Sequence, residues 1–167
     1  MDTDRDPIRV LHVGLGQIGA AIARAMAGRA DLESVAAFDP GLAVAGKTLD
    51  EICGDGVVSL PVRGDLGAAL VDGGGPQVAL HAVASRILDI EPQLVALARA
   101  GLNVVTTAEE LIYPRPCHSE ATARIDAAAR EAGVTIFAAG VNPGMLMDRL
   151  PIYLSSLCIR VSGVRVG

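Results

Sequence analysis

The sequence is most constrained by the stretch from Val10 to Arg24, which reads V-L-H-V-G-L-G-Q-I-G-A-A-I-A-R. A buried strand over Ile8–Val13 is expected to enter a turn rich in glycine and then a helix. Apolar residues recur along that helix at a spacing typical of one buried face. The residues predicted for this face are Ile18, Ala21, Ile22, Ala25 and Met26.

Each glycine of the turn meets a different requirement of a dinucleotide-binding site. Gly14 permits the tight turn, Gly16 lets a pyrophosphate approach the backbone, and Gly19 lets the helix pack close to the strand. Free amide groups at the helix N-terminus then attract the phosphates. We therefore assign Gln17 and Ile18, in the first helical turn, to the same cofactor site.

An acidic residue follows at the distance that such a site requires. The run Ser34–Phe38 reads as a second strand, and Asp39 closes it about twenty residues after the last glycine. A carboxylate there accepts hydrogen bonds from both ribose hydroxyls and repels a 2′-phosphate. The sequence therefore predicts NAD as the cofactor, with NADP as the second candidate.

Strands and helices alternate along the rest of the chain, which predicts a doubly wound, mostly parallel α/β sheet of the Rossmann type. Pro151 should kink or restart the last helix. Further strands are expected at Gln77–Val83, Leu102–Thr106, Val134–Ala138 and Ile159–Val166, and helices from Glu91–Pro92 to Gly101, over Ser119–Glu131 and from about Met145 to Ser156.

Composition limits the classes of partner. The chain has 167 residues, a net charge of −5 and no basic run, which argues against nucleic acid and an anionic membrane surface. Its first residues do not resemble a signal peptide, and no apolar run is long enough to span a bilayer, so we expect a cytoplasmic protein. The cysteines at 53, 117 and 158 are interpreted as buried thiols, and no metal site is expected.

Polar residues beyond the ends of the later strands complete the predicted site. Glu109 and Glu110 follow a strand directly, where one of them is expected to deprotonate an amine or activate a water molecule that attacks an imine. For His81 a place under the cofactor and a place in the core are both open. The remaining residues assigned to cofactor binding are Ala82, Ser85, Thr106 and Asn142.

Three segments carry a family resemblance. They read G-L-N-V-V-T-T-A-E-E-L-I-Y-P, I-D-A-A-A-R-E-A-G-V-T and G-V-N-P-G-M-L-M-D-R-L-P. The chain resembles the 2,4-diaminopentanoate dehydrogenase group, which also contains NAD(P)-dependent amine dehydrogenases and whose N-terminal domain is similar to dihydrodipicolinate reductase. The reductase itself is a weaker match, because its basic substrate-binding motif is not visible here.

The resemblance implies reversible oxidative deamination of an amine or diamino acid, with hydride moving from the amine-bearing carbon to the nicotinamide. It also implies that Glu109 and Glu110 face the substrate amine and that the protein is a homodimer. Such enzymes carry a second domain, most of which this chain lacks. We expect a cofactor domain over residues 1–157 and the start of a truncated domain over 158–167. The alternatives are an imine reductase similar to dihydrodipicolinate reductase and a non-catalytic NAD-binding sensor module.

Overall fold

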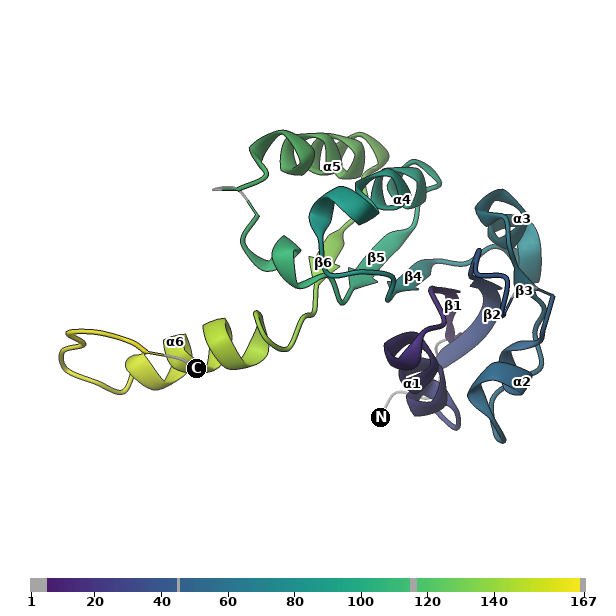
Figure 1. Ribbon diagram of the computed structural model, residues 1–167, viewed down its shortest axis with the longest axis horizontal. Helices are drawn as coiled ribbons and strands as arrows, with labels where there is room; N and C mark the ends of the chain where they lie inside the picture. Colours follow the sequence, from purple (N-terminus) through teal and green to yellow (C-terminus); the bar gives the residue numbers. More distant parts are fainter. Residues whose placement is uncertain (1–5, 45, 115–116, 166–167) are drawn as a thin grey trace.

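The computed structural model describes residues 6–44, 46–114 and 117–165, and they form one parallel six-stranded sheet with helices on both faces (Figure 1). The strand order is β3-β2-β1-β4-β5-β6, which reverses direction between β1 and β4 and is the order of a Rossmann fold. The predicted fold class is therefore confirmed. The strands are β1 (Ile8–Val13), β2 (Leu32–Phe38), β3 (Val62–Arg63), β4 (Val78–His81), β5 (Asn103–Thr106) and β6 (Ile136–Ala138).

Two apolar cores cover the two faces of the sheet. One contains Ala20 and Ala23 of α1 (Gln17–Met26) with Leu49 and Cys53 of α2 (Leu49–Cys53). The other packs α3 (Leu66–Val71), α4 (Ile87–Arg99) and α5 (Ser119–Ala132) against the opposite face. Ladder hydrogen bonds and burial on both sides fix the carboxyl ends of the strands, and so the loops that follow them.

The predicted buried face of α1 is confirmed at Met26 and is wrong at Ile18, Ala21 and Ala25. Gly19, Ala20, Ala23 and Met26 are buried, whereas Ile18 is 59% exposed and Ala21 and Ala25 also face outward. Small residues form the buried side because α1 packs closely on the sheet, and hydrophobicity alone does not reveal this preference. In α5, Ala121, Ile125 and Ala128 are buried, and Ala132 at the end of the helix is exposed.

Helix α4 begins earlier than the sequence suggested. We expected Pro92 near the first turn, but the helix starts at Ile87 and Pro92 lies inside it. The displaced start shortens the preceding strand, which ends at His81 instead of Val83. The apolar residues Leu94, Leu97 and Ala98 form the buried face of α4.

The C-terminal part leaves the sheet as an extended arm (Figure 1). It consists of a π-helical turn η3 (Met145–Arg149) and α6 (Leu150–Ser155), and Pro151 stands at the start of α6, as the predicted restart required. The strand predicted over Ile159–Val166 is absent from the described residues 159–165, which are exposed; Val166 lies outside the described residues. No other strand of the described chain lies beside this segment to bond with it.

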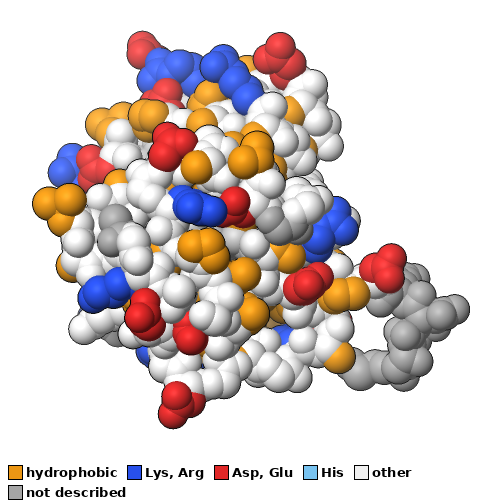
Figure 2. All heavy atoms as spheres, turned by 90° about the vertical axis from the view of Figure 1, so that its right-hand side faces the viewer, with side chains coloured by type: hydrophobic (Ala, Val, Ile, Leu, Met, Phe, Trp, Pro, Cys, Tyr) orange, Lys and Arg blue, Asp and Glu red, His pale blue; other side chains and the backbone are white. Residues whose placement is uncertain are grey.

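The face of the molecule with α2 and α3 carries charges of both signs (Figure 2). Acidic and basic side chains are interspersed on the face that Figure 2 shows, which is the side with α2 and α3. Among the residues described, no helix is long and apolar enough to cross a membrane. The expectation of three buried cysteine thiols holds only for Cys53, because Cys117 and Cys158 are exposed.

Candidate cofactor and active site

The turn between β1 and α1 requires glycine at two positions. Gly14 has a φ of +84°, and a Cβ there would lie 2.7 Å from the carbonyl oxygen of Ala82. A Cβ on Gly19 would overlap the carbonyl group of Gly14. These contacts draw α1 against the ends of β1 and β4 and bring Ala82 beside the turn.

Gly16 has a different role, because a Cβ at this position would meet no atom within 4 Å. Gly16 is the N-cap of α1, and no side chain caps the free amides of that helix. By contrast, Asp65 caps α3 and the Thr48–Glu51 capping box closes α2. An uncapped helix start beside open space at the β1–β4 switch point fits the phosphates of a dinucleotide.

Asp39 lies at the same edge and is bonded to the turn itself. Its Oδ2 accepts a hydrogen bond from the backbone N–H of Leu15 at 2.7 Å, and its Oδ1 accepts one from Gly41 at 2.7 Å. A carboxylate has about four acceptor sites, so both oxygens retain capacity for ribose hydroxyls. The guanidinium of Arg63, on the neighbouring strand β3, is paired with Asp72 at 2.8 Å.

The remaining residues assigned to cofactor binding differ in how accessible they are. Gln17, Ile18, Ser85 and Asn142 are exposed, and the carbonyl oxygen of Ser85 accepts a hydrogen bond from the N–H of Glu110 at 3.2 Å. Thr106 is fully buried, so its side chain has no surface for a cofactor and that contact was predicted wrongly. At the end of β5, the side chain of Thr106 points into the core. The sequence pattern of this strand did not show on which face of the sheet the side chain would lie.

The acidic pair lies in a short 3₁₀ turn η2 (Glu109–Ile112) directly after β5, at the carboxyl edge of the sheet. The Glu110 carboxylate accepts a hydrogen bond at 2.8 Å from the N–H of Ile87, in the first turn of α4. The same oxygen, Oε2, lies 3.4 Å from Nε2 of His118. Glu110 is therefore engaged in holding η2 to the start of α4 and to the start of α5.

Glu109 is arranged differently. No hydrogen bond or ion pair to its carboxylate is found in the described part of the chain. Its stem lies against the end of β6, so that a Cβ on Gly140 would be 3.2 Å from Cγ of Glu109. The absence of a carbon at Gly140 thus leaves room for Glu109, which lines a cavity of about 210 Å³.

This cavity contains residues that the sequence analysis did not assign to the site. It lies beside η2, and its walls are mostly apolar. The sequence did contain a signal for these residues, namely the length of the loop between β5 and α5. Because this loop leaves the carboxyl edge of the sheet, its side chains are expected near the site. Besides Glu109, the lining consists of Glu110, Ile112, Tyr113, Pro114, Cys117, His118, Pro143 and Asp148.

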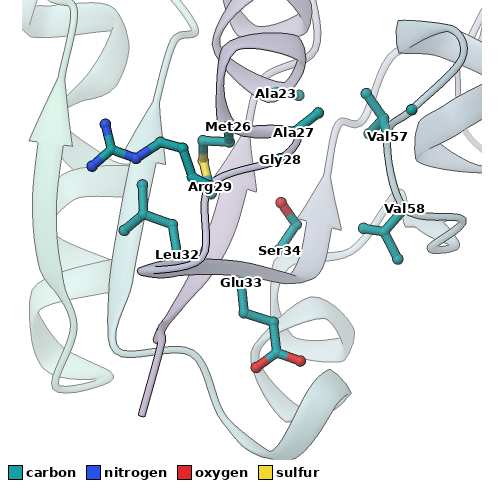
Figure 3. Close-up of a pocket in the computed structure, with 11 residues that line it drawn as sticks. Ala23, Met26, Ala27, Gly28, Arg29, Leu32, Glu33, Ser34, Val57 and Val58 are labelled. Carbon is teal, nitrogen blue, oxygen red and sulfur yellow. The ribbon is translucent and has the colours of Figure 1, made fainter. Parts of the chain in front are cut away.

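A second hollow, of about 220 Å³, lies at the opposite edge of the sheet (Figure 3). It is formed by the end of α1, the start of β2 and the loop around Val57, so it is remote from the glycine turn at the start of α1. The charged ends of Arg29 and Glu33 extend away from Ala23 and Ala27 (Figure 3). We therefore place the functional site at the carboxyl edge, where the glycine turn and η2 lie.

The fold and the glycine turn define the class of protein: a Rossmann-type domain like those of nicotinamide-dependent dehydrogenases. More particularly, the chain is 27% identical over 95% of its length to 2,4-diaminopentanoate dehydrogenase of Acetoanaerobium sticklandii, of which it covers 45%. It superimposes on an amine dehydrogenase from Mycobacterium smegmatis with a TM-score of 0.84 and 26% identity, covering 96% of this chain and 47% of the other. These similarities confirm the resemblance seen in the sequence.

A third similarity is shorter. Over 62 residues, 37% of the chain, it is 43% identical to 4-hydroxy-tetrahydrodipicolinate reductase of Picosynechococcus, of which it covers 22%. No protein-family profile matches the chain. The chain spans about half the length of the amine dehydrogenase and of the 2,4-diaminopentanoate dehydrogenase that it matches.

Proposed function

We propose that the chain binds NAD(H) and is the cofactor-binding part of an oxidoreductase that acts on the CH–NH₂ group of amines or diamino acids. The observation that carries the proposal is the open, uncapped start of α1 at Gly16, bordered by Asp39 at the switch point of the sheet. The similarity to the two amine-oxidising dehydrogenases supports the substrate class. Asp39 favours NAD over NADP because its charge repels a 2′-phosphate.

Cofactor binding is tested by calorimetry with NADH. Replacing Gly16 with Val fills the open space at the phosphate position and should abolish binding, while the helix content stays nearly unchanged. Ala25→Val is the matched control, because Ala25 is exposed near the other end of the same helix. If Gly16→Val binds NADH as tightly as the parent and the Ala25→Val control do, the assignment of the glycine turn to cofactor binding is contradicted.

For catalysis we propose that Glu109, not Glu110, receives the proton from the substrate ammonium. NAD, when bound, accepts hydride from the amine-bearing carbon. Removal of the ammonium proton leaves the nitrogen lone pair free to stabilise the carbon as hydride departs, and water then adds to the resulting iminium and releases ammonia. Glu109 is suited to this step because its carboxylate lines the cavity without a partner in the described residues, whereas Glu110 is bonded to Ile87.

The division between the two carboxylates is tested in a longer protein with measurable amine oxidation. Glu109→Gln should lower kcat by about 10²–10⁴, the range for loss of a general base. Glu110→Gln should lower it far less, since its amide oxygen still accepts from the N–H of Ile87. Equal losses in both variants would contradict the assignment. The 167-residue chain alone should bind cofactor with negligible turnover, because η2 supplies only one wall around the reacting carbon.

The short, higher-identity match to the dipicolinate reductase supports a second candidate, the reduction of a cyclic imine. The same groups would then act in reverse, with Glu109 donating a proton to the nitrogen as hydride reaches the carbon. Comparison of an acyclic amine with a cyclic imine as substrates of the longer protein separates the two.

We also propose that the arm belongs to an interface and that residues 158–167 begin a separate domain, beyond a cofactor domain over 1–157. Supporting this, Met145, Leu146, Tyr153 and Leu157 are exposed although large and apolar. A homodimer built through the arm should dissociate in sedimentation experiments when Leu146 and Tyr153 are changed to Ser. A cytoplasmic location agrees with exposed free thiols at Cys117 and Cys158.

A further inference from the structure

A chain of hydrogen bonds runs beneath η2, and all but one of its members are fully buried. His81, Thr106 and Ala108 have no exposed surface, and Gln93 of α4 is half-buried. His81 and Thr106 are the last residues of β4 and β5 and are register partners. The chain therefore spans two strand ends and a helix directly behind the turn that carries Glu109.

In this row of hydrogen bonds each group donates to the next, from Ala108 through Thr106 and His81 to Gln93. The N–H of Ala108 donates to Oγ1 of Thr106 at 3.1 Å. The Thr106 hydroxyl lies 2.9 Å from Nδ1 of His81, which is the only acceptor found for its proton among the described residues. Nε2 of His81 then donates to Oε1 of Gln93 at 3.1 Å. His81 is thus a neutral imidazole that carries its proton on Nε2.

Burial agrees with this neutral form, because desolvation lowers the pKa of His81. A leucine at position 81 would fill the space of His81 without requiring polar partners. Each buried polar group here needs a hydrogen-bond partner, because an unpaired one would destabilise the fold. Both ring nitrogens of His81 and the hydroxyl of Thr106 have such a partner. These hydrogen bonds fix the path of the backbone at Ala108, the residue immediately before Glu109.

We propose that His81 and Thr106 are positioning residues for the carboxylate of Glu109. Thr106 fixes the N–H of Ala108, and His81 fixes the rotamer of Thr106 by accepting its hydroxyl proton. From the other side, Glu110 bonds to Ser85 and Ile87. The turn η2 is held from both directions, and Glu109 is the carboxylate of the pair left without a hydrogen bond or ion pair among the described residues. The inference rests on the proposed role of Glu109, but its geometry is independent of it.

The test is NMR spectroscopy of this chain with labelled histidine and backbone. In the parent protein, Nδ1 of His81 should be unprotonated and Nε2 protonated. Thr106→Val should accelerate amide exchange at Ala108 by about tenfold, the loss expected for one net hydrogen bond. It should also shift the resonances of Glu109 while those of Gly14 to Asp39 stay unchanged. Thr106→Ser retains the hydroxyl and should restore the parent spectrum. Thr135→Val, at an exposed site before β6, is the control.

Each outcome decides the proposal. A proton on Nδ1 of His81 in the parent protein would overturn the chain of donors, even if Thr106→Val did not fold. Unmoved Glu109 resonances in a folded Thr106→Val variant would overturn the positioning role and leave Thr106 a merely structural residue. NADH titration of the parent chain reports on the cofactor proposal separately, because the histidine and exchange measurements need no ligand.

Discussion

The two turns at the carboxyl edge of the sheet are built in different ways. The turn after β1 is made of backbone: two of its glycines allow close contacts, and the third leaves open space before free amides. The turn after β5 is made of side chains, since η2 is held by Thr106 from below and by Glu110 at the start of α4. The backbone turn has no room for an added carbon at Gly14 or Gly19, whereas the side-chain turn depends on partners distant in sequence.

This difference has a consequence for how each turn can be recognised and altered. The glycine turn is local, so its function can be lost by one added methyl group. The acidic turn is distributed over β4, α4, β5 and α5, so single changes there weaken one support among several. The following experiments test this contrast, from the largest expected effect to the smallest.

The largest effect is expected within the glycine turn. Gly19→Ala places a carbon against the Gly14 carbonyl and should destabilise the fold by about 3 kcal/mol. Gly16→Ala adds the same methyl group where no atom lies within 4 Å and should change stability by less than about 0.5 kcal/mol. Urea denaturation measures both. Equal stabilities would show that the turn can relax and is less rigid than the contacts indicate.

The buried histidines behind the two turns should make stability fall in mild acid. Burial lowers the pKa of His12 to about 4, and its Nε2 lies 2.9 Å from Oγ of Ser34. The unfolded chain takes up this proton near pH 6.5 and the folded chain only near pH 4, so stability present above 6.5 is lost as pH falls between these values. The loss from His12 alone should be about 3 kcal/mol.

The measurement compares urea denaturation at several pH values for the parent and His12→Gln. Carboxylates titrate in both proteins, so both should lose stability between pH 7 and pH 4. The variant should lose less than the parent because it lacks the buried His12. Parallel curves would show that the pKa of His12 is the same in the folded and unfolded states, so that burial does not lower it. Burial also lowers the pKa of His81, so the contribution of His81 to the loss of stability in acid should persist in the His12→Gln variant.

The next effect concerns cofactor choice at the glycine turn. Asp39→Ser removes a charge that would repel a 2′-phosphate and should narrow the preference for NAD over NADP by about tenfold, as measured by calorimetry. Arg29→Ser is the control, because its guanidinium is paired with Asp31 and lies beside the hollow remote from the glycine turn. A parent chain that binds NADP as tightly as NAD would mean that a cation such as Lys47 or Arg63 offsets Asp39.

The smallest effect is expected at the acidic turn. Glu110→Ala removes the acceptor for the Ile87 N–H at the start of α4 and should cost about 1 kcal/mol of stability. Glu109→Ala removes no hydrogen bond seen in the described chain and should be within about 0.5 kcal/mol of the parent. Chemical denaturation distinguishes them. A larger loss for Glu109 would place it in the structural support and would argue against its proposed role.

The sequence alone located the strand–turn–helix unit, the doubly wound sheet and most strand ends. These follow from local patterns: apolar runs make buried strands, and Gly14 and Gly19 occur where only glycine fits. Asp39 was likewise expected beside the turn from its distance in sequence, and its carboxylate accepts a hydrogen bond from the N–H of Leu15. The sequence did not find the buried side of α1, because small residues mark the close contact there and larger apolar residues face outward.

Tertiary structure alone decided how the acidic turn is divided. The adjacent residues Glu109 and Glu110 have identical side chains and both line the cavity, and only their partners distinguish them. Glu110 contacts Ile87 and His118, whereas the Glu109 carboxylate has no hydrogen bond or ion pair among the described residues. It also turned Thr106 and His81 inward and left residues 159–165 without a strand partner. The physical reason is the same in each case. Backbone geometry is set by neighbours in the chain, whereas the direction and burial of a side chain are set by residues that only folding brings beside it.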